Sequence, residues 1–337
     1  MAEALPFAPR RELGRTGFVA TSLGIGDLAD RSVPIETCVA TVRRALDAGL
    51  NVIDTAPNYE DGYSEEIVGR AARGLRRDSV FVIDKIDHHE EPVGPQIDGS
   101  LTRLGLGHAD AFVFHGLSSL DAFDRHCRPG EGFGQLADAV RAGKYRFRGI
   151  SSHNPDALRA VLAAGVCDIV MFPVGPFVDP RYLTDILPLA KSLGVGTVCF
   201  KTFGAGKLLG DTTGYNQPLK ARPRGKVSSG GSDDAEAVFP RLTVEDCLHY
   251  TLTLNPDVAL LGLNYPNEQD AAAGSFSPLT SDQMEDIRRR AVEACGTRGR
   301  AGGTLTRRCE PRSDRSGFRL SDIPTSQRVS PGIMLLQ

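Results

Sequence analysis

Four polar side chains of the sequence have the types and spacing that proton transfer to a carbonyl oxygen requires. Asp54, Lys85 and His115 each come at the end of a short apolar segment. Tyr59 follows five residues after Asp54. A lysine ammonium close to a tyrosine lowers the pKa of the hydroxyl from its ordinary value of about 10, and an aspartate keeps the lysine charged. A histidine can orient the carbonyl oxygen. Because no side chain supplies a hydride, the chemistry also requires a cofactor.

Each of these residues also has a purely structural explanation. Asp54 could cap a helix or bond a loop, and Lys85 could be a solvated strand end. His115 could be a satisfied polar residue beneath a loop, and Tyr59 could be a packed aromatic whose hydroxyl meets water. Four titratable groups that converge on one place are harder to explain in this way, and such convergence is typical of active sites.

Short apolar segments alternate with amphipathic ones up to about residue 295. The apolar segments are mostly rich in β-branched or aromatic residues, as buried parallel strands are. The predicted strands are Thr21–Gly24, Asn51–Asp54, Val80–Asp84, Ala109–Phe114, Phe147–Ile150, Asp168–Phe172, Val195–Phe200 and Val258–Leu261. Helical spacing is found over Thr37–Ala48, Gln135–Ala142, Pro155–Ala164, Tyr182–Leu193, Thr243–Leu254 and Thr280–Ala294. Ser64 and Thr243, each followed by acidic residues, are predicted to cap helices.

Eight strands, each followed by a helix or a long connecting segment, predict an α/β fold of the (β/α)8 or TIM barrel type. A doubly wound open sheet is the alternative, which a GxGxxG turn after the first strand would favour. The segment Gly24–Ala29 has the first two glycines of that motif and lacks the third. In a barrel the active site lies at the C-terminal ends of the strands, so Asp54, Lys85 and His115 are expected on one face.

Two segments depart from this alternation. Gly204–Pro240, after the seventh strand, is rich in glycine, proline, serine and charge, and a loop of such length is usually functional or mobile. Residues 297–337 carry many arginines and few acids and lose the apolar periodicity. They predict a disordered tail, with a basic interaction arm as the alternative. The expected organisation is therefore a barrel over residues 1–296 and a basic tail over 297–337.

The composition narrows the classes of function. The 337 residues are 41% apolar, enough for a large core, and the formal net charge of -3 gives no sign of a nucleic-acid or membrane-surface partner. No apolar run approaches the roughly 20 residues that cross a bilayer. The first residues lack the apolar segment of a signal peptide, so a cytoplasmic protein is expected. The oligomeric state stays open.

The seven cysteines form no CxxC pair. Their odd number and wide spacing argue against a disulfide framework and against a closed zinc or iron–sulfur site. They are expected to be buried small hydrophobic residues, and no metal is expected.

Several motifs resemble those of the aldo-keto reductases over roughly residues 10–295. Arg11–Gly17 is similar to the opening β-hairpin of that family, and Asn51–Tyr59 to the signature around its aspartate and tyrosine. Asp110–His115 is similar to the segment that delivers its histidine, and Ala142–Asn154 to its fifth-strand motif. The resemblance implies a nicotinamide-dependent oxidoreductase that reduces an aldehyde or ketone, with a small-molecule carbonyl compound as substrate.

The resemblance also implies roles for individual residues. Tyr59 would be the general acid, Lys85 would lower its pKa, and Asp54 would pair with Lys85. His115 would position the substrate carbonyl. The implied cofactor contacts are Ser151 and Ser152 on the carboxamide, Phe200 on the nicotinamide ring, and the segment from Lys201 through Gly204 to Lys207 over the pyrophosphate.

The implied cofactor pocket departs from the family pattern. Ser152 stands where asparagine is common, and Met171 where glutamine usually holds the carboxamide; a thioether is only a weak acceptor. After the last strand, Asn264 and Glu268 replace basic side chains that would grip a 2′-phosphate. The loss of these basic side chains favours NAD. NADP is favoured by the family as a whole, and also by the positive charges of Lys207 and of the basic segment 220–226. Both cofactors therefore stay open.

An iron–sulfur cluster and two alternative functions also have to be considered. Gly204–Leu209 and Leu242–Leu248 resemble a branch of the family whose members sometimes carry an iron–sulfur appendix; Cys295 and Cys309 alone cannot form one, so no cluster is expected. A cofactor-binding sensor or regulatory subunit with little turnover is one alternative to a reductase. A Schiff-base aldolase with Lys85 as nucleophile is the other, and it requires a desolvated lysine without a partner.

Overall fold

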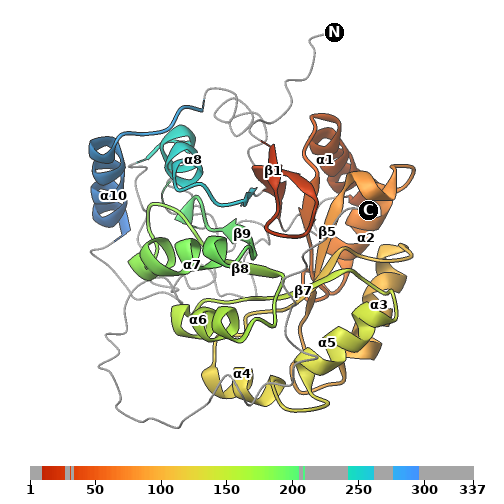
Figure 1. Cartoon of the computed structure of the whole chain (residues 1–337). Coiled ribbons are helices and arrows are strands. Elements are labelled where there is room, and N and C mark those ends of the chain that lie inside the picture. Colours follow the sequence, from red (N-terminus) through yellow and green to blue (C-terminus); the bar gives the residue numbers. More distant parts are fainter. Residues whose placement is uncertain are drawn as a thin grey trace, which may run out of the picture.

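A closed barrel of parallel strands forms the body of the protein, with helices around it (Figure 1). The structure, a computed structural model, describes residues 10–26, 31, 34–204, 208, 242–261 and 276–295. An antiparallel hairpin of β1 (Arg10–Glu12) and β2 (Val19–Thr21) precedes the barrel, with Arg11 opposite Ala20. Both the hairpin and the (β/α)8 barrel are as predicted, and the open sheet is excluded.

Eight strands pair in chain order, and the last closes onto the first. The strands are β3 (Leu23–Ile25), β4 (Val52–Asp54), β5 (Phe81–Ile86), β6 (Ala111–Phe114), β7 (Phe147–Ser151), β8 (Ile169–Pro173), β9 (Gly196–Phe200) and β10 (Val258–Leu261). Each overlaps a predicted strand and differs from it by no more than a few residues at either end. Their apolar, β-branched sequences suit strands that are buried on both faces.

The helices lie outside the strands in Figure 1. They are α1 (Ile35–Asp47), α2 (Tyr63–Ala72), α3 (Val93–Leu104), α4 (Leu120–His126), α5 (Gly132–Arg141), α6 (Pro155–Ala164), α7 (Leu187–Ser192), α8 (Val244–Thr253) and α10 (Ser281–Cys295), with short turns at Arg77–Ser79 and Tyr182–Ile186. The sequence analysis did not predict α3 or α4. Thr243 caps α8 as predicted, through a capping box with Asp246. The predicted cap at Ser64 was wrong, because α2 begins at Tyr63 after the left-handed Gly62.

Side chains of each strand alternate between the barrel interior and the helix layer. In β5, Phe81 and Ile83 belong to the interior cluster, whereas Val82 and Ile86 pack under the helices. The interior cluster also contains Val113, Met171 and Val198 from other strands. The barrel is therefore a filled core, and polar side chains at interior positions can reach solvent only at its ends.

The hairpin closes the N-terminal end of this core. Leu13, at the turn of the hairpin, is fully buried within the interior cluster. Gly14 next to it lies against the start of β9, where an added Cβ would be 2.3 Å from the amide nitrogen of Gly196. The opposite, C-terminal end is the one left for a site.

Several predictions concern other parts of the chain. The loop Gly204–Pro240, the tail over 297–337 and Cys309 lie outside the described residues, apart from Gly204 and Leu208. Cys38, Cys127, Cys167, Cys199 and Cys247 are all buried free thiols. Among the residues that the structure describes, no helix is both long and apolar enough to cross a membrane.

Gly69 allows α2 to contact α3, and Gly69→Ala should destabilise the barrel. A Cβ there would lie 1.9 Å from the carbonyl oxygen of Leu104, a backbone atom that cannot rotate away. We expect a loss of about 1–3 kcal/mol in the free energy of unfolding, measured by urea denaturation. Gly94→Ala in α3 is the matched control, since nothing lies within 4 Å of its Cβ position. The control should be neutral or stabilising by up to about 1 kcal/mol, and equal losses in both variants would refute the steric explanation.

Candidate active site

A buried ion pair lies at the C-terminal end of the barrel. Asp54 and Lys85 occupy interior positions near the ends of β4 and β5, and their side chains are 5% and 2% exposed. Lys85 Nζ donates to Asp54 Oδ1 at 2.7 Å and to the carbonyl oxygen of Thr55 at 2.7 Å. The strand register produces this contact, because Asp54 pairs with Ile83 and Lys85 follows two residues later on the same face. Two of the four predicted catalytic residues are therefore in direct contact.

The charges of this pair stabilise each other. Burial by itself lowers the pKa of Lys85, but Asp54 and Tyr59 outweigh it, so that the pKa of Lys85 lies above its ordinary value. Burial raises the pKa of Asp54, and the Lys85 ammonium opposes this effect. A neutral Asp54 would leave a buried ammonium without a counter-charge, which is far more costly than the ion pair. Lys85 is therefore a stable cation.

Tyr59 lies over this lysine on the loop between β4 and α2. The Lys85 ammonium is 4.4 Å from the centre of its ring. The loop turns sharply, with positive φ at Glu60, Asp61 and Gly62, and the amide of Gly62 donates to the carbonyl of Pro57 at 2.7 Å. This turn brings Tyr59 back over Lys85.

His115 completes the group. It follows β6, and its ring meets the ring of Tyr59 edge to face, with 5.6 Å between the centroids. Its Nδ1 lies 2.5 Å from Oδ1 of Asp87, a buried residue that the sequence analysis did not identify. Oδ2 of Asp87 accepts a hydrogen bond from the amide of Asn58 at 2.8 Å. The alternation Phe81, Ile83, Lys85 continues to Asp87, and this signal could have placed it at the same site.

Behind the catalytic face, β5 carries a second buried carboxyl group. Asp84 points to the helix layer, and its Oδ1 accepts from the amide of Lys85 at 2.8 Å. Burial and the carboxyl group of Glu65 raise the pKa of Asp84 well above its ordinary value. Glu65 in α2 is fully buried and paired with Arg103, whose Nη2 donates to it at 3.1 Å. Both effects favour the protonated form of Asp84 in the folded protein.

The structure places the two predicted serines differently. Ser151 is at an interior position at the end of β7, and its Oγ accepts from the amide of Gly116 at 2.9 Å. Ser152 is fully buried, and its Oγ accepts from the amide of Asn154 at 3.1 Å and lies 3.3 Å from Oγ of Ser118. Ser151 is thus close to the residue after His115, whereas Ser152 stabilises the loop after β7.

Met171 and Phe200 lie at different depths. Met171 packs within the apolar interior cluster and is almost fully buried. Phe200 ends β9, is half-buried, and lies 5.2 Å from the ring of His153. Burial, with Lys201 and His115, lowers the pKa of His153 to about 4, so this histidine is neutral at pH 7. His153 is a second residue of the site that the sequence analysis missed.

Beyond β9 the chain turns away in a left-handed conformation. Lys201 has φ of 68° and Gly204 has φ of 56°, and the amide of Gly204 donates to the carbonyl of Lys201 at 2.9 Å. Thr202 Oγ1 and His153 Nδ1 are buried and have no hydrogen-bond partner among the described residues. The predicted contacts Lys207, Asn264 and Glu268 lie outside the described part of the chain.

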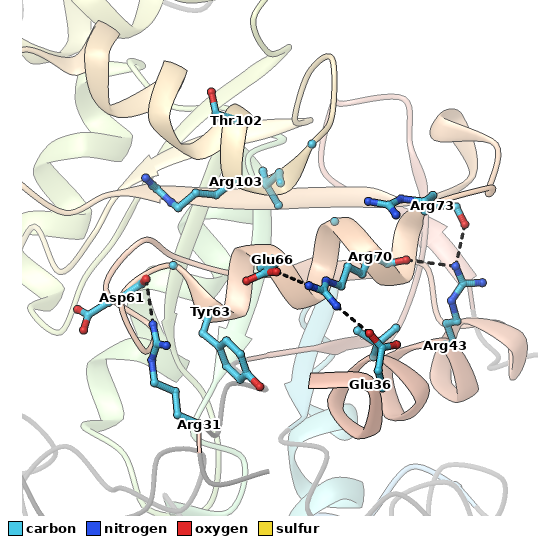
Figure 2. Close-up of a pocket in the computed structure, with 15 residues that line it drawn as sticks. Arg31, Glu36, Arg43, Asp61, Tyr63, Glu66, Arg70, Arg73, Thr102 and Arg103 are labelled. Carbon is cyan, nitrogen blue, oxygen red and sulfur yellow. Dashed lines mark hydrogen bonds and ion pairs between the residues drawn. The ribbon is translucent and has the colours of Figure 1, made fainter. Parts of the chain in front are cut away.

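A cavity of about 790 Å³ lies elsewhere, outside the barrel between α1, α2 and α3 (Figure 2). None of the four predicted catalytic residues lines it. Its arginines are held by neighbours: Arg70 donates to Glu36 at 2.7 Å and to Glu66 at 2.6 Å. Arg43 donates to the carbonyls of Arg70 and Arg73. Within the described ranges, no group of three or more histidine, cysteine or acidic side chains is arranged to hold a metal ion.

A barrel with a lysine–aspartate pair, a tyrosine and a histidine at its C-terminal end defines a known class of protein. The sequence profile described as Aldo/keto reductase family matches residues 21–289. The chain belongs to the aldo-keto reductase family.

Three known proteins illustrate the relationship. The chain is 32% identical to L-galactose dehydrogenase of Arabidopsis thaliana over 216 residues, 59% of this chain and 66% of that protein, just under two thirds of its length. It is 27% identical to the NADH-specific methylglyoxal reductase of Escherichia coli (strain K12), over 62% of this chain and 70% of that protein. The crystal structure of an aldo/keto reductase from Klebsiella pneumoniae in complex with NADP and acetate has a TM-score of 0.59 at 21% identity, over 80% and 91% of the two chains. This last likeness shows the fold.

The raised pKa of Asp84 should make stability depend on pH, and Asp84→Asn should remove that dependence. An aspartate whose pKa is raised by folding stabilises the folded state less as the pH rises above its unfolded value of about 4. Asparagine needs no proton, can still accept from the amide of Lys85, and can donate to Glu65. We expect Tm at pH 8 to rise by about 2–4 °C, as roughly 1 kcal/mol would produce, and the gain to shrink towards pH 5.

Asp98→Asn is the control for this experiment, because Asp98 is an exposed carboxylate paired with Lys144. Differential scanning calorimetry over pH 5–8 measures both variants. A gain at Asp84 that does not change with pH would mean that the residue is ionised in the folded protein.

Proposed function

We propose that the protein is a nicotinamide-dependent oxidoreductase that reduces an aldehyde or ketone to an alcohol, with Tyr59 as the general acid. The observation that carries the proposal is the stack of Asp54, Lys85 and Tyr59 at the barrel mouth, with His115 against the tyrosine ring. A buried ammonium has no role in barrel stability that an apolar side chain could not fill, whereas beside a phenol it stabilises the phenolate.

The four side chains divide the work. Asp54 and the carbonyl of Thr55 hold the Lys85 ammonium in place. The ammonium lowers the pKa of the Tyr59 hydroxyl, and the hydroxyl donates its proton to the substrate oxygen. His115 donates a second hydrogen bond to the same oxygen and orients the carbonyl. The nicotinamide, when bound, supplies the hydride that the carbonyl carbon receives.

The residues around Phe200 fit a bound nicotinamide. The half-buried ring of Phe200, at the last position of β9, offers a flat apolar surface against which a planar ring can stack. The unpartnered Thr202 Oγ1 and His153 Nδ1 supply buried polar atoms beside it, and Ser151 lies on the same interior face. Met171 is buried within the core and leaves the carboxamide without the usual amide partner, while Ser152 is already hydrogen-bonded.

The choice between NAD and NADP rests on residues beyond β9 and β10. Glu268 and Asn264 favour a free ribose hydroxyl, and so does the name of the NADH-specific relative. By the family resemblance, Lys201, Gly204 and Lys207 would belong to the segment that covers the pyrophosphate, and the Klebsiella reductase of the same fold was solved in complex with NADP.

The two rival functions have less support. A Schiff-base lysine must be neutral to attack a carbonyl, whereas the pKa of Lys85 lies above its ordinary value because Asp54 and Tyr59 outweigh its burial. A sensor or regulatory subunit would need the cofactor site without the proton donors, and Asp54, Tyr59, Lys85 and His115 are together here.

Tyr59→Phe should abolish carbonyl reduction and leave cofactor affinity nearly unchanged. The variant keeps the ring over Lys85 and removes only the hydroxyl that transfers the proton. We expect kcat to fall at least about 10²-fold, the usual contribution of a general acid, in a panel of aldehydes and ketones followed by NAD(P)H absorbance. Tyr63→Phe is the matched control, because Tyr63 lines the outer cavity. Wild-type rates in Tyr59→Phe would overturn the proposed mechanism.

Fluorescence titration with NADH and NADPH should distinguish the two cofactors. If Glu268 faces the adenosine ribose, its charge repels a 2′-phosphate, so NADH should bind about tenfold more tightly and Glu268→Gln should reduce that preference. Tighter binding of NADPH to the wild type would show that basic residues, such as Lys207, control the choice.

A further inference from the structure

Asp87 contacts the two parts of the site that would meet the substrate oxygen. Its Oδ1 faces Nδ1 of His115 at 2.5 Å, and its Oδ2 accepts from the amide of Asn58, next to Tyr59. Both carboxylate oxygens are therefore used, and the side chain is only 4% exposed. An aspartate held in this way has a single orientation toward the histidine.

The contact specifies which ring nitrogen of His115 carries a proton. Burial alone would raise the pKa of Asp87, but the hydrogen bond and charge of His115, with the amide of Asn58, lower it, so that Asp87 is ionised at neutral pH. An ionised carboxylate only accepts hydrogen bonds. Nδ1 must therefore be the donor, and in the neutral ring Nε2 has a bare lone pair.

We propose that Asp87 is a positioning residue that fixes His115 in the Nδ1–H form, so that Nε2 donates to a carbonyl oxygen only when the ring is protonated. This inference rests on the proposed function, because it concerns the direction of the same reaction. The other neutral tautomer, with Nε2–H, would place the Nδ1 lone pair against a carboxylate and is disfavoured by repulsion.

Among the charged and titratable groups around His115, Asp87 contacts the ring directly. Asp54 and Lys85 act on the site as an ion pair whose charges largely cancel. His89, in the loop after β5, has a pKa lowered by burial, and His153 after β7 has a pKa of about 4, so both are neutral at pH 7. Tyr59 contributes a neutral hydroxyl until it ionises. Lys201 is a further cation of this region, and its charge, like that of His115, acts on His153.

The two ring states suit opposite substrates. The protonated ring and the Tyr59 hydroxyl offer two donors to a carbonyl oxygen. The neutral ring offers one acceptor, which an alcohol hydroxyl satisfies and a carbonyl oxygen does not. In reduction, the carbonyl carbon gains the hydride from the reduced nicotinamide, its C–O π bond breaks, and the oxygen takes the proton of Tyr59. The site therefore favours reduction when His115 is protonated and binds the alcohol when it is neutral.

Asp87→Asn tests the proposal because the geometry dictates which way the amide faces. The amide of Asn58 needs an acceptor, so the side-chain oxygen of the asparagine takes that position. Its NH2 group then donates to Nδ1 of His115, and the neutral ring must carry its proton on Nε2. The variant should switch the tautomer without a change in size.

Nitrogen NMR on protein labelled with ¹⁵N-histidine measures this without cofactor or substrate. The His115 signals are assigned by their loss in His115→Asn. In the wild type we expect a proton on Nδ1 at every pH, and in Asp87→Asn a proton on Nε2 of the neutral ring. A neutral wild-type ring with the proton on Nε2 would overturn the proposal, and this measurement needs no variant of Asp87 to fold.

The pH profile of carbonyl reduction provides the second readout. In the wild type, kcat/KM should fall about tenfold per pH unit above the His115 midpoint seen by NMR. In Asp87→Asn, kcat/KM should fall less than about threefold per pH unit above that midpoint, because Nε2 of the neutral ring now donates. The control variant Asp98→Asn should retain the wild-type pH profile. An unchanged profile in Asp87→Asn, despite a switched tautomer, would refute the gating. If the wild type reduces no carbonyl compound, the proposed function is refuted. The NMR measurement of the His115 tautomer would still decide whether Asp87 positions the ring.

Discussion

The buried Lys85–Asp54 ion pair is the constraint on which the rest of the site depends. Two charges removed from water are tolerated only when they face each other and their remaining hydrogen bonds are satisfied. Here the second bond of the ammonium goes to the backbone of Thr55, which ties the residue after β4 to the lysine. The turn at Glu60, Asp61 and Gly62 then brings Tyr59 over the lysine. One electrostatic requirement thus links two strands and a loop.

The stagger between neighbouring strands of the barrel also places His115 at the site. Asp54 pairs with Ile83, and Lys85 lies two residues after Ile83 on β5. In the same way, Lys85 pairs with Val113, and His115 lies two residues after Val113. A closed barrel of tilted strands requires such a stagger. The alternation along β5 separates two buried ionisable groups by one residue: Lys85 faces the interior as a cation, and Asp84 faces the helices with a raised pKa.

The sequence was sufficient to predict the barrel, because apolar segments of strand length alternate with segments of helical periodicity. It also placed Asp54, Lys85 and His115, since strand ends can be read from apolar runs. The turn at Glu60 and Asp61 could not be read, because neither residue is a glycine. Helix α3 escaped prediction because it contains Gly94, Pro95 and Gly99, which disfavour helices. The roles of Asp84 and Asp87 depend on contacts between elements, which no local pattern encodes.

Asp87 also has a mechanical consequence. Because it binds the amide of Asn58 with one oxygen and His115 with the other, it links the loop that carries Tyr59 directly to the segment after β6. The ring centroids of Tyr59 and His115 are 5.6 Å apart, and this double contact restrains that distance. The other loops at the C-terminal end of the barrel can therefore differ in length and sequence without changing it.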